Sequence, residues 1–237
     1  MSGIFNFKQF SIDQSNCAMK VNTDGVLLAA LCESKSPSKI LDIGTGTGLI
    51  ALMLAQRFAD ARIDAVEIDQ AAAATAAKNF KNSTFSSRLN LISSSIADYF
   101  RNSGSTYDLI VSNPPFFIND LRSENPKKEL ARHTDITFFE TILNKSESAL
   151  SMEGSLYLIL PVDTGLLIKS MVSNMKNLKL QEELFIRSFS DSIAHRSIMK
   201  FGFGTSEPGL HDFVIYEDRG VYSEGYRELL KDFLTIF

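Results

Sequence analysis

The feature that most constrains the fold is a regular alternation of strand-like and helix-like stretches through the middle of the chain. Apolar runs typical of buried strands lie at residues 39–44, 62–69, 89–95, 107–112 and 154–161. Stretches with helical character lie between and after them, at 48–58, 70–80, 137–150 and 163–175. This alternation favours a parallel sheet covered by helices on both faces. We therefore predict an α/β fold with a doubly wound, mostly parallel sheet.

The two ends of the chain depart from this alternation. An aromatic-rich lead and a helix-like stretch, Val26–Cys32, precede the first predicted strand. We therefore treat residues 1–38 as an N-terminal cap segment within a single domain that spans 1–237. Further strand-like runs follow without an obvious helix between them, near Leu180–Ser188, Ser197–Phe203 and His211–Tyr216. We expect an antiparallel hairpin at one sheet edge there, and a helix at 223–234.

Composition places the chain among globular proteins and narrows its compartment. Hydrophobic residues make up 44% and charged residues 22% of the sequence. No apolar run approaches the roughly 20 residues that a membrane-spanning helix needs, and the first residues do not resemble a signal peptide. Cys17 and Cys32 are the only cysteines, and they lack metal-ligand spacing. We expect a cytoplasmic protein with both thiols reduced.

Charge is unevenly distributed along the chain. The net charge of −4 argues mildly against a nucleic-acid partner. The acidity is concentrated in the tail, because residues 205–237 hold seven acidic and three basic side chains, whereas residues 169–200 hold six basic and three acidic ones. A local basic surface is therefore compatible with the acidic total, although an ordinary mixed surface explains the same counts.

A glycine-rich loop connects the first predicted strand to the first predicted helix of the alternating region. It reads D-x-G-x-G-x-G, with Asp42 on the strand and Gly44, Gly46 and Gly48 in the turn. Such a turn lets a ligand lie against the backbone near helix N-terminal amides. Dinucleotide sites use a different glycine spacing, and the Asp42 carboxylate would repel a pyrophosphate. It suits the ammonium of S-adenosylmethionine, the cofactor that we expect.

An acidic pair at the end of the second predicted strand supports this interpretation. Glu67 ends the run A-V-E-I-D, where a carboxylate can accept hydrogen bonds from both hydroxyls of a ribose. Asp69 precedes the next helix and is expected to cap its N-terminus. Glu67 could instead be an exposed capping residue, but its combination with the glycine loop favours cofactor binding.

The sequence Asn-Pro-Pro-Phe, residues 113–116, follows the fourth predicted strand and points to the reaction. In a doubly wound sheet, the carboxyl ends of the central strands form the site. The side-chain oxygen of Asn113 and the carbonyl of Pro114 could accept the two protons of a planar, conjugated amino group that is being methylated. Pro114 and Pro115 would hold the acceptors rigid, and Phe116 would offer a ring for stacking.

This motif indicates a reaction type rather than one substrate. Adenine N6, guanine N2 and the side-chain amide of glutamine are all planar amino groups that it could hold. A turn that simply closes a strand would also use Asn and Pro. We expect no metal, because the three histidines lack metal-ligand spacing.

Taken together, the glycine loop and Glu67 resemble the class I, Rossmann-like methyltransferases. The whole chain further resembles the bacterial valine-tRNA adenine-37 N6-methyltransferase family. The similarity rests on F-K-Q-F (7–10), C-A-M-K-V (17–21), T-D-G-V-L-L (23–28), D-I-G-x-G-x-G-L (42–49), D-A-V-E (64–67), D-L-I-x-S-N-P-P (108–115), A-R (131–132) and H-R (195–196).

The resemblance implies a substrate and a set of site residues. The substrate would be adenine 37 of valine tRNA, a loop base that can be splayed out and stacked on an aromatic ring. The catalytic group would be Asn113, Pro114, Pro115 and Phe116. The RNA-binding group would be Phe10, Lys20, Arg132 and Arg196, with Lys8 and His133 as weaker candidates. The cofactor-binding group would be Thr23, Asp42, Gly44, Gly46, Gly48, Glu67, Ile68, Ser95, Ile96 and Asn113, with Asp24 nearby.

One position departs from the superfamily pattern. An acidic residue commonly ends the third strand and contacts the adenine of the cofactor, but this chain has Ser95 there, and Asp98 three residues later. This leaves the adenine contact open.

Three hypotheses remain in competition on the sequence. An adenine-N6 tRNA methyltransferase ranks first, and the same chemistry on ribosomal guanine or on a release-factor glutamine ranks second. A cofactor-binding RNA module without turnover ranks third. The glutamine enzymes carry a separate helical N-terminal domain, and the guanine enzymes an additional methyltransferase-like half, for which this chain has no room.

Overall fold

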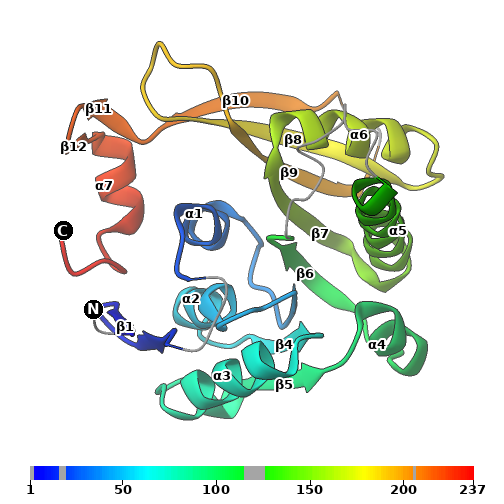
Figure 1. Ribbon diagram of the computed structural model, residues 1–237, viewed down its shortest axis with the longest axis horizontal. Coiled ribbons are helices and arrows are strands. Elements are labelled where there is room, and N and C mark those ends of the chain that lie inside the picture. The colour runs from blue at the N-terminus through cyan, green and yellow to red at the C-terminus, as the bar shows by residue number, and fades with distance from the viewer. Residues whose placement is uncertain (1–2, 16–19, 115–125, 205–206) are drawn as a thin grey trace.

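The computed structural model describes residues 3–15, 20–114, 126–204 and 207–237, and for residues 126–135 only the backbone. Figure 1 shows a central sheet with helices on both sides. The strands are β1 (Ile4–Asn6), β2 (Ser11–Asp13), β3 (Lys39–Ile43), β4 (Arg62–Glu67), β5 (Leu89–Ser93), β6 (Tyr107–Ser112), β7 (Leu150–Pro161), β8 (Leu178–Arg187), β9 (Arg196–Phe203), β10 (Gly209–Val214), β11 (Tyr216–Asp218) and β12 (Val221–Tyr222). The helices are α1 (Thr23–Leu31), α2 (Leu49–Arg57), α3 (Gln70–Lys81), the 3-10 turn η1 (Ser86–Arg88), α4 (Ile96–Asn102), α5 (Pro126–Ala149), α6 (Val162–Ser173) and α7 (Glu224–Leu230).

The main sheet has eight strands in the order β10-β8-β9-β7-β6-β3-β4-β5. Strands β5, β4, β3, β6 and β7 are parallel neighbours, whereas β9 runs antiparallel to both β7 and β8. From β3 the chain first builds outward through β4 and β5, and then returns to add β6 on the other side of β3. The strand order therefore reverses between β3 and β6, which is where open α/β sheets form their ligand sites.

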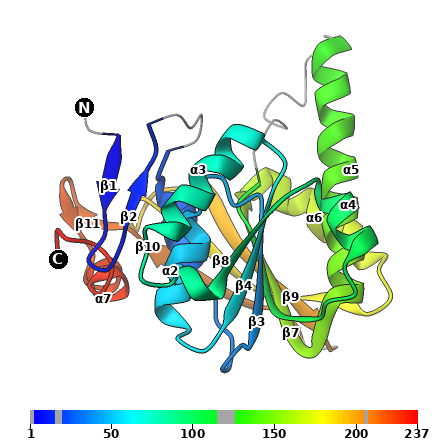
Figure 2. The same cartoon turned by 90° about the horizontal axis from the view of Figure 1, so that it is seen from below.

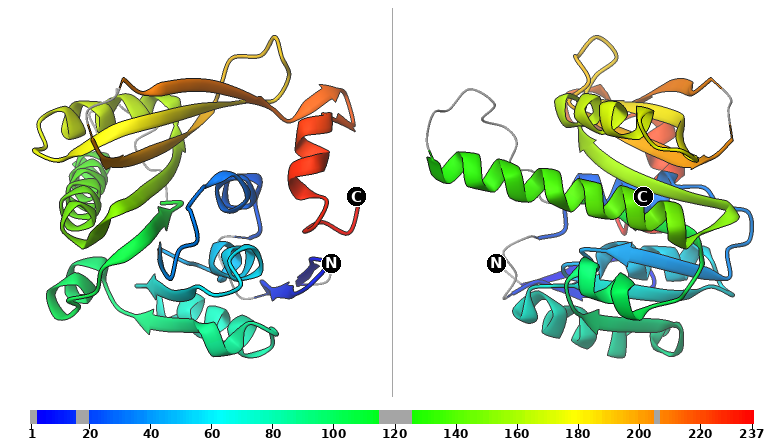
Figure 3. Two further views of the ribbon diagram at one scale, coloured as in Figure 1. Left: turned by 180° about the vertical axis from the view of Figure 1, so that it is seen from behind. Right: turned by 90° about the vertical axis from the view of Figure 1, so that its right-hand side faces the viewer.

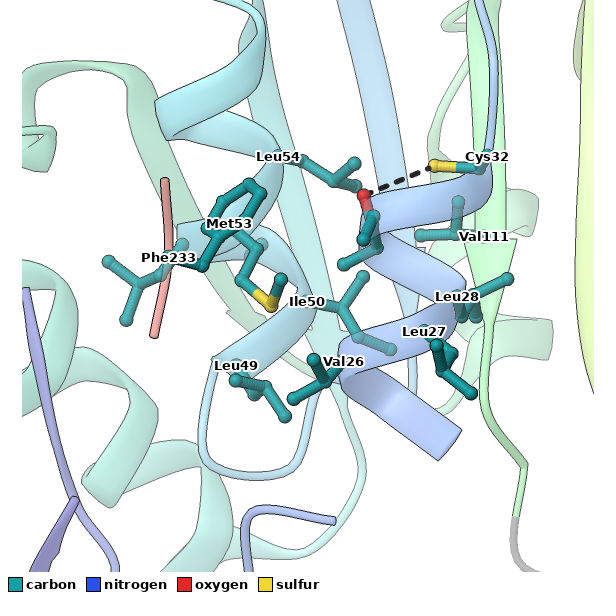
Figure 4. Packing of buried hydrophobic residues seen from close by; sticks show 14 of the residues in the cluster. Val26, Leu27, Leu28, Cys32, Leu49, Ile50, Met53, Leu54, Val111 and Phe233 are labelled. Atoms are coloured by element: carbon teal, nitrogen blue, oxygen red, sulfur yellow. Dashed lines mark hydrogen bonds between the residues drawn. The ribbon is translucent and has the colours of Figure 1, made fainter. Parts of the chain in front are cut away.

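Side chains alternate between the two faces of the sheet and create two hydrophobic clusters. Leu109 and Val111 of β6 pack with α1, α2, α3 and α7, while Ile110 packs with α5 and α6. Tyr107 joins the cluster of Ile110, because the strand register shifts between Tyr107 and Leu109. Figure 3 shows α4, α5 and α6 together on one side of the sheet and α1 and α2 on the other. Figure 4 shows how closely α1 and α2 interlock over β6. The core positions both site-bearing loops at one edge of the sheet.

The first and last segments of the chain pack against each other. Strands β1 and β2 form an antiparallel hairpin, and Figure 2 shows this hairpin beside α7. The backbone joins the two ends, because Phe7 bridges to Leu234 and the Lys8 amide donates to the Phe233 carbonyl at 2.8 Å. The acidic tail is thus held against the N-terminal segment.

The sequence predictions agree with the central elements and miss some peripheral ones. The predicted doubly wound, mostly parallel sheet is confirmed, and the antiparallel β8–β9 pair is present, with β10 added beyond it parallel to β8. The prediction gave no strands for β1 and β2 and no helix for α4. It began the helix before β7 at residue 137, whereas α5 begins at Pro126. Among the described residues, no helix is long and apolar enough to cross a membrane.

Candidate active site at the carboxyl ends of the central strands

The glycine loop between β3 and α2 contains three residues with left-handed backbone conformation. The φ angles are 72° for Gly44, 57° for Gly46 and 86° for Gly48. A side chain on Gly48 would place its Cβ 2.4 Å from the ring of Phe80. At Gly44 and Gly46, no described atom lies within 4 Å of an added Cβ. Gly48 is therefore required for packing against α3, whereas Gly44 and Gly46 border open space beside the loop.

Glu67 at the end of β4 holds this loop in place. Its Oε2 accepts a hydrogen bond from the Gly46 amide at 2.8 Å, and its Oε1 accepts one from the Asp69 amide at 2.9 Å. Glu67 as a whole is only 8% exposed. An ionised carboxylate offers about four acceptor positions, so two remain for a bound hydroxyl pair. The geometry fits the ribose role expected from the sequence, and it also gives Glu67 a structural role.

Asp42 lies directly under the glycine loop and is fully buried. Its Oδ2 accepts a hydrogen bond from the Thr45 hydroxyl at 2.6 Å, while its Oδ1 has no hydrogen-bond partner in the part of the chain that the structure describes. Burial raises the pKa of Asp42 to about 7, although Thr45 and the Ala51 amide act in the opposite direction. A cation near this carboxyl would favour its ionised form.

The third strand of the alternating region is β5, which ends at Ser93, and the cap of α4 follows two residues later. Ser95 caps α4, since its hydroxyl accepts from the Asp98 amide at 3.1 Å and donates to the Asp98 carboxylate at 2.7 Å. Asp98 lies in the first turn of α4 and not in a loop. Ile96 is the first residue of this helix and is half-buried. The serine that the sequence placed at the cofactor adenine thus has its hydroxyl engaged within its own helix.

Ile68, unlike Ile96, has a largely exposed side chain. It follows Glu67 at the end of β4, and 72% of it is exposed. A large apolar side chain at this edge of the sheet offers a surface for a planar ring. Asp69 caps α3 as predicted, because its carboxylate accepts from the Ala72 amide at 2.8 Å.

Asn113 and Pro114 follow β6 at the point where the strand order reverses. Ser112 pairs with Ile43 of β3 and donates its hydroxyl hydrogen to the Ile43 carbonyl at 2.8 Å. This pairing places Asn113 beside the start of the glycine loop. Asn113 is half-buried and Pro114 is buried. The predicted catalytic residues Pro115 and Phe116 lie outside the described residues.

The N-terminal helix α1 also reaches this site. Asn22 caps it by accepting from the Gly25 amide at 2.8 Å, and Thr23 is its exposed first residue. A Cβ built on Gly25 would lie 3.6 Å from Nδ2 of Asn113 and 3.5 Å from Oδ1 of Asn22. The first turn of α1 therefore lies against the predicted catalytic amide.

The residues proposed for RNA contact have varied surroundings. Phe10 is buried, stacks on Phe7 with ring centroids 4.5 Å apart, and meets the Phe85 ring edge-on. Lys20 is exposed just before α1. Arg196 forms an ion pair with Asp24, with 2.8 Å between Nε and Oδ2. The geometry favours a packing role for Phe10.

The other basic candidates fall into two groups. Lys8 is hydrogen-bonded through its ammonium to the carbonyl of Lys231 at 2.5 Å. Arg132 and His133 belong to α5, and their side chains lie outside the described residues. The sequence could not show that Lys8 is engaged by the C-terminal segment, because that partner lies 223 positions away.

A hollow lies away from the residues described above. It has a volume of about 490 Å³ and is lined by side chains that include Glu33, Arg57, Glu153 and Lys200. It shares no lining residue with the glycine loop or with Asn113. In the described part of the chain, no group of three or more His, Cys, Asp or Glu residues could hold a metal ion.

Sequence reasoning overlooked three residues of this site. Thr45 supports Asp42, Asn22 caps α1, and Gly25 allows α1 to approach Asn113. A signal for Asn22 existed, because Asn is a preferred N-cap residue. The proximity of Gly25 to Asn113 is a tertiary contact that no local pattern encodes.

Comparison with known proteins agrees with this geometry. The family model of the methyltransferase small domain matches residues 16–186. A crystal structure of a predicted O-methyltransferase from Agrobacterium tumefaciens superposes with a TM-score of 0.67 at 19% identity, covering 89% of this chain and 96% of that one, and so shares the fold. The fold and the site thus define an S-adenosylmethionine-dependent methyltransferase.

Curated relatives narrow this class. The tRNA1(Val) (adenine(37)-N6)-methyltransferase of Pedobacter heparinus is 46% identical over 237 residues, with 100% of both chains covered. The protein of the same name from Parabacteroides distasonis is 37% identical over 232 residues, covering 97% of this chain and 96% of the relative. The chain belongs to the tRNA1(Val) (adenine(37)-N6)-methyltransferase family.

The residues present fit the cofactor of this class. The unpartnered Oδ1 of buried Asp42 suits the ammonium of S-adenosylmethionine, and open space borders Gly44 and Gly46. Glu67 has acceptor capacity left for ribose hydroxyls, and the exposed side chain of Ile68 suits an adenine ring.

Proposed function

We propose that this enzyme methylates the exocyclic N6 of adenine 37 in valine tRNA. The observation that carries the proposal is the 46% identity over complete chains to a relative named for that reaction. The sequence Asn-Pro-Pro at the carboxyl end of β6 supports it, because it can hold a planar amino group.

In this proposal the end of β6 binds the target amine. The Asn113 side-chain oxygen and the Pro114 carbonyl accept hydrogen bonds from the two N–H groups of the N6 amine. These hydrogen bonds localise the nitrogen lone pair and direct it out of the plane of the base. Pro114 is buried and its φ angle is restricted by its ring, so the acceptors are held rigid before the substrate arrives. Pro115 limits the backbone in the same way, and Phe116 stacks on the base.

The cofactor residues hold the methyl donor beside that amine. S-adenosylmethionine supplies an activated methyl group on a cationic sulfonium, which leaves as a neutral thioether. Asp42 and Thr23 bind its amino-acid end, and Gly44 and Gly46 border its path along the loop. Glu67 binds the ribose, while Ile68 and Ile96 pack against the adenine.

Two predicted cofactor residues receive narrower roles in this proposal. Ser95 can contact the cofactor only through the capacity left after capping α4. Gly48 acts indirectly, because its missing side chain lets α3 approach the loop.

The RNA is bound by basic side chains around the site. Lys20 is exposed next to the first turn of α1, and Arg132 lies on α5 beyond the end of β6. Such residues position an anticodon loop through its phosphates, while stacking holds the extruded base. A tRNA substrate places this activity in the cytoplasm.

Nucleoside mass spectrometry of valine tRNA, incubated with the enzyme and S-adenosylmethionine, tests the proposal. We expect N6-methyladenosine at position 37 with the wild type and at least about a hundredfold slower formation with Asn113→Ala. Total tRNA, ribosomal RNA and release factor are assayed in parallel. Methyl transfer to guanine or glutamine, with none to adenine 37, would retain the methyltransferase class and overturn the substrate.

A further inference from the structure

An ion pair joins α1 to β9, an antiparallel strand of the main sheet. Asp24 is the second residue of α1, and Arg196 is the first residue of β9. Their Nε and Oδ2 atoms are 2.8 Å apart, although 172 positions separate the residues in sequence. Arg196 pairs with Pro161 at the end of β7, which lies at the same edge of the sheet as Asn113.

The turn of α1 that carries Asp24 also contacts the catalytic region. The neighbouring Gly25 is buried, and a Cβ there would lie 3.1 Å from Leu49 and 3.6 Å from Nδ2 of Asn113. Leu49 is the first residue of α2, directly after the glycine loop. Figure 4 shows Leu49 close to Val26 of α1. A single helical turn thus borders both the cofactor loop and the amide that binds the target amine.

We propose that the Asp24–Arg196 ion pair is a positioning device for the methyl transfer, which holds the first turn of α1 against Asn113 and so fixes the orientation of its amide. This inference rests on the proposed role of Asn113. The amide nitrogen lies toward Gly25, which leaves the oxygen as the end available for the target amine. If the α1 turn moved away, the amide could rotate and lose that orientation.

The partial burial of the pair supports a local positioning role. The side chains of Arg196 and Asp24 are 28% and 23% exposed, so the contact is shielded from solvent on most sides. About a quarter of each side chain nevertheless stays in contact with solvent, and ion pairs that keep solvent contact typically contribute about 1 kcal/mol or less to stability. Small displacements of a reacting group can nevertheless cost about a hundredfold in rate. The pair should therefore influence turnover much more than folding.

This assignment changes the role expected for Arg196. As a phosphate contact, Arg196 would act on RNA affinity, and removal of its Asp24 partner would leave that affinity unchanged or strengthen it. If Arg196 instead forms a positioning pair with Asp24, neutralising either residue must give the same phenotype. A phosphate contact therefore predicts different effects of neutralising Arg196 and Asp24, whereas a positioning pair predicts the same effect.

The test compares Asp24→Asn, Arg196→Gln and Arg196→Lys in the full-length enzyme with valine tRNA. We expect the first two to lower kcat about tenfold or more, with the KM for tRNA within about threefold of wild type. Because Thr23 lies on the same turn, the Kd for S-adenosylmethionine can rise as well, but equally in both variants. Because lysine keeps the positive charge that pairs with Asp24, Arg196→Lys should recover part of the activity. Glu182→Gln, which removes the Lys200–Glu182 pair of 2.7 Å elsewhere on β9, is the matched control and should stay within about twofold.

A double-mutant cycle tests whether the pair acts through Asn113. In an Asn113→Asp background, Asp24→Asn should have little further effect on kcat, because the orientation to be protected has changed. Full additivity would overturn the inference. So would a raised KM for tRNA and a weaker salt dependence in Arg196→Gln alone, which would assign Arg196 to phosphate binding.

Unchanged kcat in both Asp24→Asn and Arg196→Gln would also overturn it. Thermal melting of each variant identifies any loss of folding, and Asp24→Asn carries the test if Arg196→Gln does not fold. If the wild type methylates a substrate other than adenine 37, the proposed function fails by itself. The ratios among the variants are then measured on that substrate.

Discussion

The two halves of the proposed active site, one for the cofactor and one for the target amine, are assembled in different ways. The cofactor half is formed by a nearly continuous segment, in which Asp42, the glycine loop and Glu67 lie within 26 positions and support one another through short-range hydrogen bonds. The target half combines the start of α1, the end of β6 and the start of β9. Its contacts join parts of the chain that are far apart in sequence, including a pair separated by 172 positions.

This difference predicts that changes in the two halves affect cofactor binding and turnover separately. The cofactor half can keep its shape when distant contacts are lost, because its hydrogen bonds are internal to the β3–α2–β4 unit. The target half depends on the correct packing of α1, β6 and β9. We therefore expect changes in the first half to act on cofactor affinity and folding, and changes in the second half to act on kcat.

The largest effect should follow from Asn113→Ala. It removes one of the two acceptors for the target amine, and loss of a preorganised polar group of this kind typically costs about 10²–10³ in kcat. The Kd for S-adenosylmethionine, measured by calorimetry, should change by less than about threefold because the cofactor half remains intact. High residual activity would remove Asn113 from the reaction.

Gly48→Ala should be the most damaging change to folding in the cofactor half. The new Cβ would meet the Phe80 ring at 2.4 Å in a backbone with φ of 86°. Overpacking and left-handed strain together predict a loss of about 2–4 kcal/mol in unfolding free energy. Gly44→Ala is the control, because it adds strain without a clash and should cost about 1–2 kcal/mol. Equal losses in urea denaturation would contradict the packing role of Gly48.

Asp42→Asn should change how cofactor affinity depends on pH. Because burial raises the pKa of Asp42 to about 7, the wild type must release a proton to offer a carboxylate to a cation at lower pH. Wild-type affinity for S-adenosylmethionine should therefore rise about tenfold from pH 6 to pH 8. The variant should bind more weakly at pH 8 and show a flat profile, measured by calorimetry across this range.

The raised pKa of Asp42 also affects stability, which should fall as the pH rises, whereas cofactor affinity should increase. The folded-state pKa lies above the unfolded one, so the unfolded chain ionises first as the pH rises from about 4 to 7. The unfolding free energy contributed by Asp42 is present at low pH and is lost across this window. Asp42→Asn should raise the melting temperature more at pH 8 than at pH 5. A uniform shift would show that Asp42 is already ionised in the folded protein.

Ser95→Ala should give the smallest effect, and it tests whether Ser95 belongs to the cofactor half of the site. Loss of the α4 cap predicts a cost of about 1 kcal/mol in unfolding free energy. Cofactor affinity should stay within about twofold if the hydroxyl serves mainly as a cap. A large drop in affinity without a drop in stability would restore Ser95 as an adenine contact.

Sequence patterns could predict one half of the site better than the other. The pattern D-x-G-x-G-x-G followed by Glu67 lies within one strand–helix–strand unit, and the structure joins Glu67 to the glycine loop inside that unit, as the spacing of the motifs suggests. The position of Asn113 followed from the end of a buried strand in an alternating α/β pattern. The bounds of β6, Tyr107–Ser112, agree with the prediction because an apolar run ends abruptly at a polar residue and two prolines.

The misses have physical causes as well. Strands β1 and β2 are three residues each, too short to show an alternating pattern, and the hairpin packs on the C-terminal segment, a partner distant in sequence. Phe10 looked suited to base stacking because it is aromatic, yet burial against Phe7 decides its role. The Asp24–Arg196 pair joins residues whose charges are unremarkable until the sheet brings them together.

The bridge between Phe7 and Leu234 has a consequence for the order of assembly. Synthesis proceeds from the N-terminus, so the hairpin emerges from the ribosome long before the segment on which it docks. A ribosome-bound chain can therefore build the β3–α2–β4 unit before its N-terminal segment has a place to bind. The hairpin can therefore dock only after Phe233 and Leu234 have been synthesised, when the contacts among Asp42, the glycine loop and Glu67 can already be in place.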